Sequence, residues 1–261
     1  MRVEHQQGVY DVRCEWGRHG VEMLARECAV VVIVDVLSFC TSVDVAVGRG
    51  ARVLPQRWHN PYAAREAATH GALRAGPRDG DGPSLRPSSL LDLAAGIVLA
   101  LPSPNGASLC AAAARHEAVV FAGCLRNATA VATAAVATAA VSAGGPIGVV
   151  PAGERWPDDT LRVAAEDALG AGAIVAAIGR GSLSPEAELV AAQFAAAATR
   201  LPELLAGLAS GRELITDGYG ADVDLAAAHD VSPAAPRLVD GVLTCPPSPS
   251  AELPRGAVTR P

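Results

Sequence analysis

The chain has 261 residues, of which 50% are hydrophobic and 3% aromatic, so it is long and apolar enough for an α/β core built mainly from alanine, valine and leucine. Its formal charge is −6, which argues against nucleic acid or an anionic membrane as a partner. The chain contains no lysine, which excludes Schiff-base chemistry and a P-loop. A bound anion would therefore be held by arginine or histidine, and the planar fork of arginine suits phosphate, sulfonate and carboxylate.

Six cysteines are scattered along the chain without a C-x-x-C pair, so no structural zinc site is expected. The polar N-terminal stretch does not resemble a signal peptide, and no apolar run reaches membrane-spanning length without Gly, Arg or Pro. These features favour a cytoplasmic protein with reduced thiols and no membrane contact.

Short apolar runs alternate with alanine-rich helical stretches from residue 28 onward. Strands are expected at 28–36, 51–58, 96–103, 117–124 and 146–153. Helices are expected at 41–50, 60–71, 105–116, 128–144, 161–179 and 184–200, followed by a helix pair in 211–230 and a closing strand or hairpin at 235–246. This alternation predicts a largely parallel sheet with helices on both faces. One domain, of one or two lobes, is expected over 1–245, and the proline-rich residues 246–261 are expected to be a disordered tail.

Polar and glycine residues follow four of these strands directly. Ligands of parallel α/β sheets bind at the carboxyl ends of the strands, beside helix N-termini. We therefore expect the four strand ends to face one edge and to form a site there. Their residues are Asp35, 103–106, 123–127 and 153–154.

Asp35 ends the first strong strand. It could cap the next helix or pair with an arginine, or it could bind Mg²⁺ or orient a water molecule. The hydroxyls of Ser38, Thr41 and Ser42 follow it, where they could bond an oxyanion or simply cap the helix.

Two further turns resemble anion sites. Asn105 and Gly106 permit a tight turn whose backbone N–H groups can cradle an anion. The stretch 123–128 repeats this arrangement and adds Arg126, while Asn127 is placed to cap the helix after it.

Acidic residues are densest at 153–167. Glu154 and Arg155 follow a strand, and 158–160 has the pattern of a helix start. Glu166 and Asp167 lie within the expected helix, with Asp167 placed either on its wet face or toward the sheet. An acid facing the sheet would need an arginine or a metal as its partner.

Several common catalytic motifs are missing from the sequence. It has no G-x-G-x-x-G after a first strand, no H-E-x-x-H and no G-x-S-x-G. The stretch after Asp35 also lacks the second acid of the Asp-x-Asp-x-Thr phosphatases, so a phospho-aspartyl route is not favoured.

Five segments, taken in order, resemble the 2-phosphosulfolactate phosphatases, the ComB-like proteins of coenzyme M biosynthesis. They are "VVIVDVLSFCTSVDVAVGRGA", "LPSPNGASLC", "VVFAGCLRNATAVA", "VVPAGERWPDDTLRVAAEDALGAGAIV" and "GYGADVDLAAAHDVSPAAPRLVDGVL". The resemblance implies a three-layer α/β/α fold with a largely parallel or mixed central sheet. It also implies Mg²⁺-dependent hydrolysis of a small phosphate monoester that carries sulfonate and carboxylate groups.

The positions that match the family pattern are Asp35, Asn105, Gly106, Asn127, Gly153, Glu154, Glu166 and Asp167. Together with the candidates taken from the sequence itself, they lead to hypotheses for individual roles. The residues expected to be catalytic are Asp35, Glu154 and Asp167. The expected Mg²⁺ ligands are Asp35, Glu154, Glu166 and Asp167. The expected contacts with the anionic phosphoester are Ser38, Thr41, Asn105, Gly106, Arg126, Asn127 and Arg155. Alanine-rich helix faces leave room for a homodimer.

The chain departs from the family pattern at three places. The family's Asn-Ser-Pro is replaced by Pro-Ser-Ser at 87–89. Where the family has Arg and a run of Thr after Asp-Val-Leu, this chain has residues 38–42, "SFCTS". In the middle loop, at 76–80, the family's Glu is absent and Arg78 remains. Two alternatives therefore stay open: a family member that binds a small anionic metabolite without turnover, and a phosphatase for a different phospho-acid.

Overall fold

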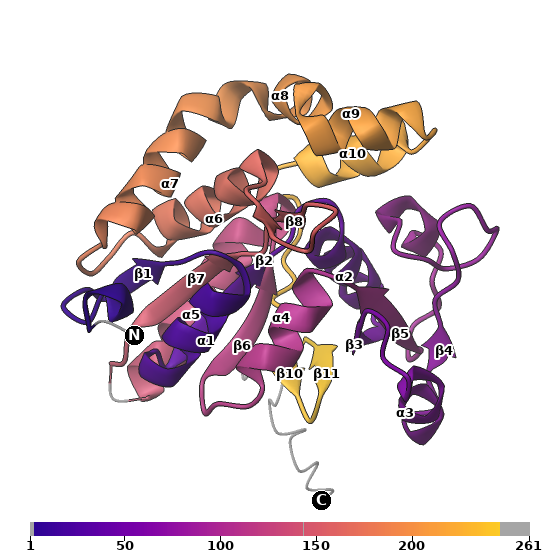
Figure 1. The fold of residues 1–261 in the computed structure, drawn as a ribbon, viewed down its shortest axis with the longest axis horizontal. Coiled ribbons are helices and arrows are strands. Elements are labelled where there is room, and N and C mark those ends of the chain that lie inside the picture. Colours follow the sequence, from indigo (N-terminus) through magenta and orange to yellow (C-terminus); the bar gives the residue numbers. More distant parts are fainter. Residues whose placement is uncertain (1–2, 143, 246–261) are drawn as a thin grey trace, which may run out of the picture.

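The computed structural model describes residues 3–142 and 144–245 (Figure 1), so the tail expected at 246–261 lies outside the described residues. Nine strands form one mixed sheet, which is one of the two sheet types expected from the sequence. In spatial order they are β1 (Val12–Cys14), β7 (Ile147–Pro151), β2 (Val30–Val34), β6 (Val119–Gly123), β10 (Arg237–Val239), β11 (Val242–Thr244), β3 (Arg52–Arg57), β5 (Val98–Ser103) and β4 (Leu73–Arg74).

The sheet consists of two parallel halves joined by an antiparallel hairpin. One half contains β1, β7, β2 and β6, and the other contains β3, β5 and β4. The β10–β11 hairpin pairs with β6 through Arg237 and Phe121, and with β3 through Leu243 and Val53. Strand β2 is fully buried, as its unbroken run of Val and Ile predicts.

Helices cover both faces of this sheet (Figure 1). They are α1 (Gly17–Glu27), α2 (Phe39–Gly48), α3 (Ala63–Thr69), α4 (Gly106–Ala113), α5 (Ala128–Val141), α6 (Ala165–Ile178), α7 (Pro185–Ala197), α8 (Leu201–Gly207), α9 (Ala209–Thr216) and α10 (Gly220–Ala227). Helices α1 and α4 pack on one face of β7 and β2, α5 and α6 pack on the other, and α7 lies over α6. The three-layer α/β/α prediction is confirmed.

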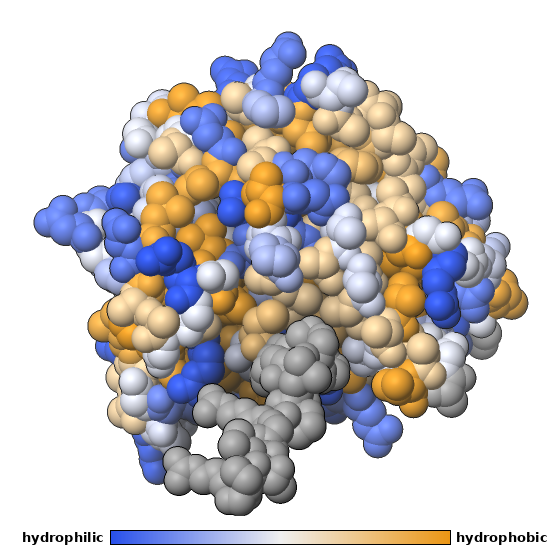
Figure 2. All heavy atoms as spheres, turned by 180° about the vertical axis from the view of Figure 1, so that it is seen from behind, coloured by the Kyte–Doolittle hydropathy of each residue, from blue (hydrophilic) through white to orange (hydrophobic). Residues whose placement is uncertain are grey.

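Helices α2 and α4 contact strands of both halves of the sheet. They therefore bring the end of β5 next to the end of β2, although these strands belong to different halves. One apolar core runs through both halves. The face seen from behind mixes weakly hydrophobic areas with hydrophilic ones (Figure 2), as expected for a helical layer rich in alanine.

The sequence prediction fails in several regions, among them 73–74 and 201–207, which form β4 and α8 where no strand or helix was expected. The helix expected at 161–179 begins only at Ala165, because 161–162 forms strand β9 and pairs with β8 (Glu154–Arg155). The residues taken as a helix start, 158–160, instead form the turn of this hairpin, where Asp158 Oδ1 accepts hydrogen bonds from the N–H and hydroxyl of Thr160. Strand β1 and helix α1 were also not predicted.

No helix within the described ranges combines the length and the hydrophobicity that a membrane crossing would require.

Candidate active site

Asp35 lies directly after β2 and is 4% exposed. Its Oδ1 accepts a hydrogen bond from the N–H of Phe39 (3.1 Å), at the start of α2. Its Oδ2 accepts one from the N–H of Gly106 (2.8 Å), at the start of α4. One carboxylate therefore holds two helix N-termini together, so the capping interpretation of Asp35 is part of its role.

Asp167 occupies a similar place on the other side of β2. It lies in the first turn of α6, faces the sheet and is buried. Its Oδ1 accepts from the N–H of Val36 (2.7 Å) and its Oδ2 from the N–H of Gly153 (2.8 Å). Gly170 lets α6 approach this closely, since a Cβ there would lie 2.7 Å from a methyl of Val36. Of the two placements that the sequence left open for Asp167, the structure shows the one toward the sheet.

Two glutamates complete the group. Glu154 is partly buried, and its Oε2 accepts a hydrogen bond from Asn105 Nδ2 (2.9 Å). Glu166 is 2% exposed, and its Oε1 is buried with no hydrogen-bond partner among the described residues. We call Asp35, Glu154, Glu166 and Asp167 the acid cluster.

The carboxylates of the acid cluster influence one another's charge. Burial raises the pKa of Asp35, with the nearby charge of Glu166 adding to it, although hydrogen bonds from Gly106 and Phe39 oppose the rise. Burial, with the charges of Asp35 and Glu166, holds the pKa of Asp167 well above its usual value. Burial and the charge of Asp35 raise the pKa of Glu154 to about 7. The cluster therefore favours protons or a cation.

Arg78 is a cation whose charge acts on this cluster. Its Nη2 donates to Ser38 Oγ at 3.4 Å, its Nη1 is buried without a hydrogen-bond partner in the part of the chain described, and its charge lowers the pKa of Asp35. In the sequence, Arg78 was noted only as the residue of the family's middle-loop pattern that this chain keeps. Contact with Ser38, across 40 positions of sequence, makes it a candidate site residue.

A short network holds the Arg78 loop in place. Arg86 Nη1 donates to the carbonyl of Arg78 (2.8 Å), and its guanidinium lies over the ring of Tyr219. Asp222, which is buried in α10, lies 3.9 Å from Arg86 Nε and accepts from the N–H of Ser88. Helix α10 thus positions the loop that carries the candidate cation.

Three of the residues expected to contact the substrate already bond to other groups of the protein. Thr41 Oγ1 donates to the carbonyl of Val36 (2.7 Å). Asn127 Oδ1 accepts from the N–H of Cys124 (2.9 Å) and does not cap α5 with its side chain. Arg126 Nε forms an ion pair with Asp44 Oδ2 at 2.8 Å. These contacts hold the segments around the site in place, and they leave fewer polar groups free to bind a ligand.

Arg126 differs most from its expected role. Besides its ion pair with buried Asp44, its Nη1 donates to the carbonyl of Leu225 (3.1 Å). The N–H of Gly106 is likewise used by Asp35 rather than left free for an anion. An anion at this site would therefore meet Arg78 and Ser38 before Arg126 or that N–H.

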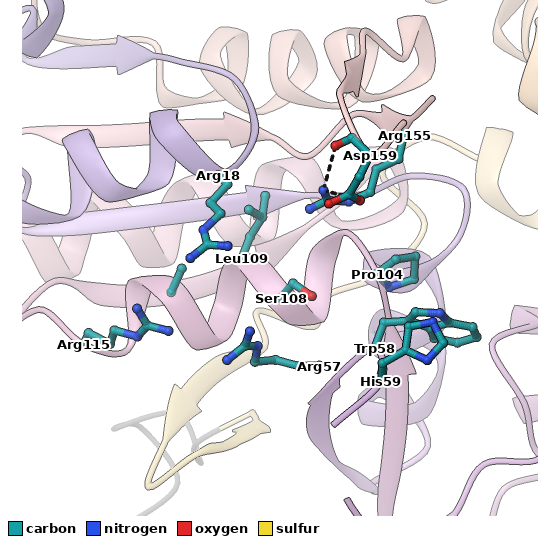
Figure 3. Close-up of a pocket in the computed structure, with 11 residues that line it drawn as sticks. Arg18, Arg57, Trp58, His59, Pro104, Ser108, Leu109, Arg115, Arg155 and Asp159 are labelled. Carbon is teal, nitrogen blue, oxygen red and sulfur yellow. Dashed lines mark hydrogen bonds and ion pairs between the residues drawn. The ribbon is translucent and has the colours of Figure 1, made fainter. Parts of the chain in front are cut away.

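A cavity of about 550 Å³ opens beside the acid cluster. Asn105 and Glu154 line it together with Arg18 and Arg155. Arg155 is paired with exposed Asp159 at 2.8 Å (Figure 3). The acid cluster is therefore accessible from the solvent through Glu154.

Buried cysteines near the site are poor nucleophiles. Burial raises the pKa of Cys110 and Cys124 to about 12, and it holds the pKa of Cys40 well above its usual value. These thiols stay protonated at neutral pH, and only a thiolate attacks readily.

The acid cluster fits a hard divalent cation by its chemistry. Carboxylate oxygens are the ligands that Mg²⁺ prefers, and Glu166 Oε1 is buried without a hydrogen-bond partner among the described residues. Among the described residues, no group of three or more His, Cys, Asp or Glu side chains is arranged as a ready metal site. Mg²⁺ often uses only one or two protein carboxylates and keeps several waters, so three are not required.

Comparison with known proteins agrees with the resemblance seen in the sequence. The family model described as 2-phosphosulpholactate phosphatase matches residues 21–241, nearly the whole chain. No curated protein matches the sequence significantly. The matched region contains every residue of the acid cluster as well as Arg78.

Proposed function

Because the chain belongs to the 2-phosphosulpholactate phosphatase family, whose activity is that of a phosphoric monoester hydrolase, we propose that it hydrolyses a small phosphorylated acid with the help of Mg²⁺. The proposed substrate is 2-phosphosulfolactate, which would yield sulfolactate and phosphate, a step of coenzyme M biosynthesis in the cytoplasm. The observation that carries this proposal is the convergence of four carboxylates and Arg78 from distant parts of the chain.

Arg78 is the proposed phosphoryl-binding group. Its Nη1 is buried without a partner within residues 3–142 and 144–245, so it keeps hydrogen-bonding capacity for an oxyanion. Charge-assisted hydrogen bonds from arginine to phosphate are strong because both partners are ionised. Ser38 Oγ, in contact with Arg78, is placed to bond the same anion.

Glu154 is the proposed proton carrier. Its pKa of about 7 leaves it partly protonated at neutral pH, where a general acid or base works best. Asn105 Nδ2 holds one of its oxygens, so the other is the one available for a proton. In this role Glu154 takes a proton from the attacking water or gives one to the leaving oxygen.

Asp35 and Asp167 are proposed to supply negative charge as well as structure. Each of their oxygens already accepts one backbone hydrogen bond, and a carboxylate oxygen can accept another partner. With Glu154 and Glu166 they are the proposed ligands of Mg²⁺. When bound, the ion would supply Lewis-acid stabilisation of the charge on the phosphoryl group.

A phosphate-release assay tests this proposal. The substrates would be 2-phosphosulfolactate, 2-phospholactate and p-nitrophenyl phosphate, each with Mg²⁺ or with EDTA. We expect Mg²⁺-dependent release that is fastest with the sulfonated substrate. Release fastest from 2-phospholactate would indicate a phosphatase for another phospho-acid. No release from any substrate would favour a family member that only binds a small anionic metabolite, a role that the changed residues 38–42 make conceivable.

A further inference from the structure

A second cavity, separate from the acid cluster, lies beside α4. Its volume is about 230 Å³, and four arginines line it (Figure 3): Arg18 at the start of α1, Arg57 at the end of β3, Arg115 just after α4, and Arg155 in β8. None of the four acid-cluster residues lines it. Its floor is the outer side of α4, with Ser108, Leu109 and Ala112.

The charge of this cavity is unusual for the protein. One carboxylate, that of Asp159, lines it against four guanidinium groups, whereas the whole chain carries a formal charge of −6. In Figure 3 the guanidinium groups of Arg18, Arg57 and Arg115 are turned toward one another across α4. Like charges so arranged repel one another, and a bound anion would remove that repulsion.

The donors of these arginines are largely available. In the described part of the chain, the side chains of Arg57 and Arg115 make no hydrogen bond or ion pair. Arg18 pairs with Glu22 at 3.2 Å and Arg155 with Asp159 at 2.8 Å, each between one exposed and one partly exposed side chain. Exposed pairs of this kind are weak and exchange easily with another anion.

We propose that this arginine cavity binds a small multivalent oxyanion, carrying phosphate or carboxylate groups, at a site separate from the acid cluster. Each guanidinium offers a planar fork that matches two oxygens of such a group. The volume limits the ligand to a few such groups, because pockets for drug-sized molecules start near 300 Å³. Arg18 and Arg155 also line the cavity that reaches Glu154, so the two sites are neighbours.

Calorimetric titration with inorganic diphosphate, in EDTA and at low salt, tests the proposal. Four proteins are compared: the wild type, Arg57→Ala/Arg115→Ala, the charge-matched control Arg65→Ala/Arg212→Ala, and Arg78→Ala. Arg65 and Arg212 are exposed and lie outside the cavity. Each lost charged hydrogen bond costs about tenfold in affinity, so the cavity variant should bind at least about tenfold more weakly at the arginine cavity, whereas the charge-matched control should bind like the wild type. Because Arg78 is itself a proposed phosphoryl-binding group, Arg78→Ala should weaken only binding at the acid cluster and leave binding at the arginine cavity unchanged.

Three outcomes would overturn the proposal: no binding to the wild type at millimolar diphosphate, equal loss in the cavity variant and the charge-matched control, or loss in Arg78→Ala alone. The last would place the anion at the acid cluster. A parallel titration with citrate separates the sources of the ligand, because tighter citrate binding indicates a polycarboxylate and tighter diphosphate binding a phosphorylated one. Both titrations measure binding without turnover, so they do not depend on whether the protein is a phosphatase.

Discussion

Asp35 and Gly106, 71 residues apart in the sequence, are joined by a hydrogen bond of 2.8 Å from the N–H of Gly106 to Oδ2 of Asp35. The other oxygen of the same carboxylate accepts from the N–H of Phe39. Both acceptors are thus used by backbone donors, and the site is assembled around this one side chain. Asp35, which we propose as a ligand of Mg²⁺, is at the same time a structural tie between α2 and α4.

Asp35→Asn is therefore expected to lower stability as well as activity. An amide has one oxygen, so its NH₂ group would face one of the two N–H donors and leave it unsatisfied. The expected loss is about 1–3 kcal/mol in the free energy of unfolding, measured by urea denaturation, together with loss of phosphate release. The exposed Asp159→Asn is the control, with little expected change in stability. A fully stable Asp35→Asn would contradict the two backbone bonds.

Gly106→Ala tests the same junction from the other side. A Cβ at Gly106 would lie 2.8 Å from Asp35 Oδ2 and closer still to the ring of Phe39. We expect a destabilisation of about 1–3 kcal/mol, as for other overpacked core sites. Gly48→Ala, in α2, meets nothing within 4 Å and should be neutral or slightly stabilising. Equal effects of the two substitutions on the urea midpoint would argue against the close packing described.

Arg78→Ala should affect catalysis more than folding. Its charge lowers the pKa of Asp35, so its removal should raise that pKa and move the acidic limb of the kcat/KM profile to higher pH. It should also raise KM about tenfold or more, because a charged contact with phosphate is lost. Arg78→Lys keeps the charge without the fork, so it should restore the position of the acidic limb while KM stays raised. An unshifted profile in Arg78→Ala would remove Arg78 from the site.

Glu154 makes a pH dependence of stability measurable. Its pKa is about 7 in the folded protein, against 4.5 as its usual value, so the folded state keeps this proton to a higher pH than the unfolded state. The stabilisation from this proton is complete below about pH 4.5 and is lost as pH rises through about 7. In metal-free buffer, Tm should therefore fall over this range. The fall should be smaller in Glu154→Gln, whereas exposed Glu213→Gln should behave like the wild type.

The strands and helices that frame the site were largely predictable from the sequence. Strand β2 is a run of branched residues, and α5 and α6 are alanine-rich, so periodicity and composition identify them. Strand β1 has three residues, too few for a pattern to show. The hairpin of β8 and β9 was mistaken for a helix start because Asp and Thr favour both helix N-termini and turns.

The acid cluster was predicted because acids at strand ends and in an apolar helix are rare enough to stand out. The partners of Arg126 and Arg78 were not predicted. Arg126 is held by Asp44 across 82 positions, and Arg78 reaches Ser38 across 40 positions through a loop without regular structure. Such pairs depend on how the two halves of the sheet come together, and local sequence patterns contain no information about that.

Glu166 gives the most direct test of the proposed Mg²⁺ site. Its Oε1 is buried without a hydrogen bond among the described residues, and its charge adds to the raised pKa of Asp167. In metal-free buffer, Glu166→Gln removes a like charge from the cluster and should raise Tm at pH 8. With the wild type, Mg²⁺ at ten times the Kd measured at pH 8 should add about 1.4 kcal/mol of stability at that pH. The same Mg²⁺ concentration should add less at pH 5, because the carboxylates bind a cation only when deprotonated. The variant should lose most of this increment, while exposed Glu213→Gln keeps it. If Mg²⁺ raised the Tm of the wild type and of Glu166→Gln equally, Glu166 would not be a ligand, because Mg²⁺ would then bind and stabilise the protein without this carboxylate.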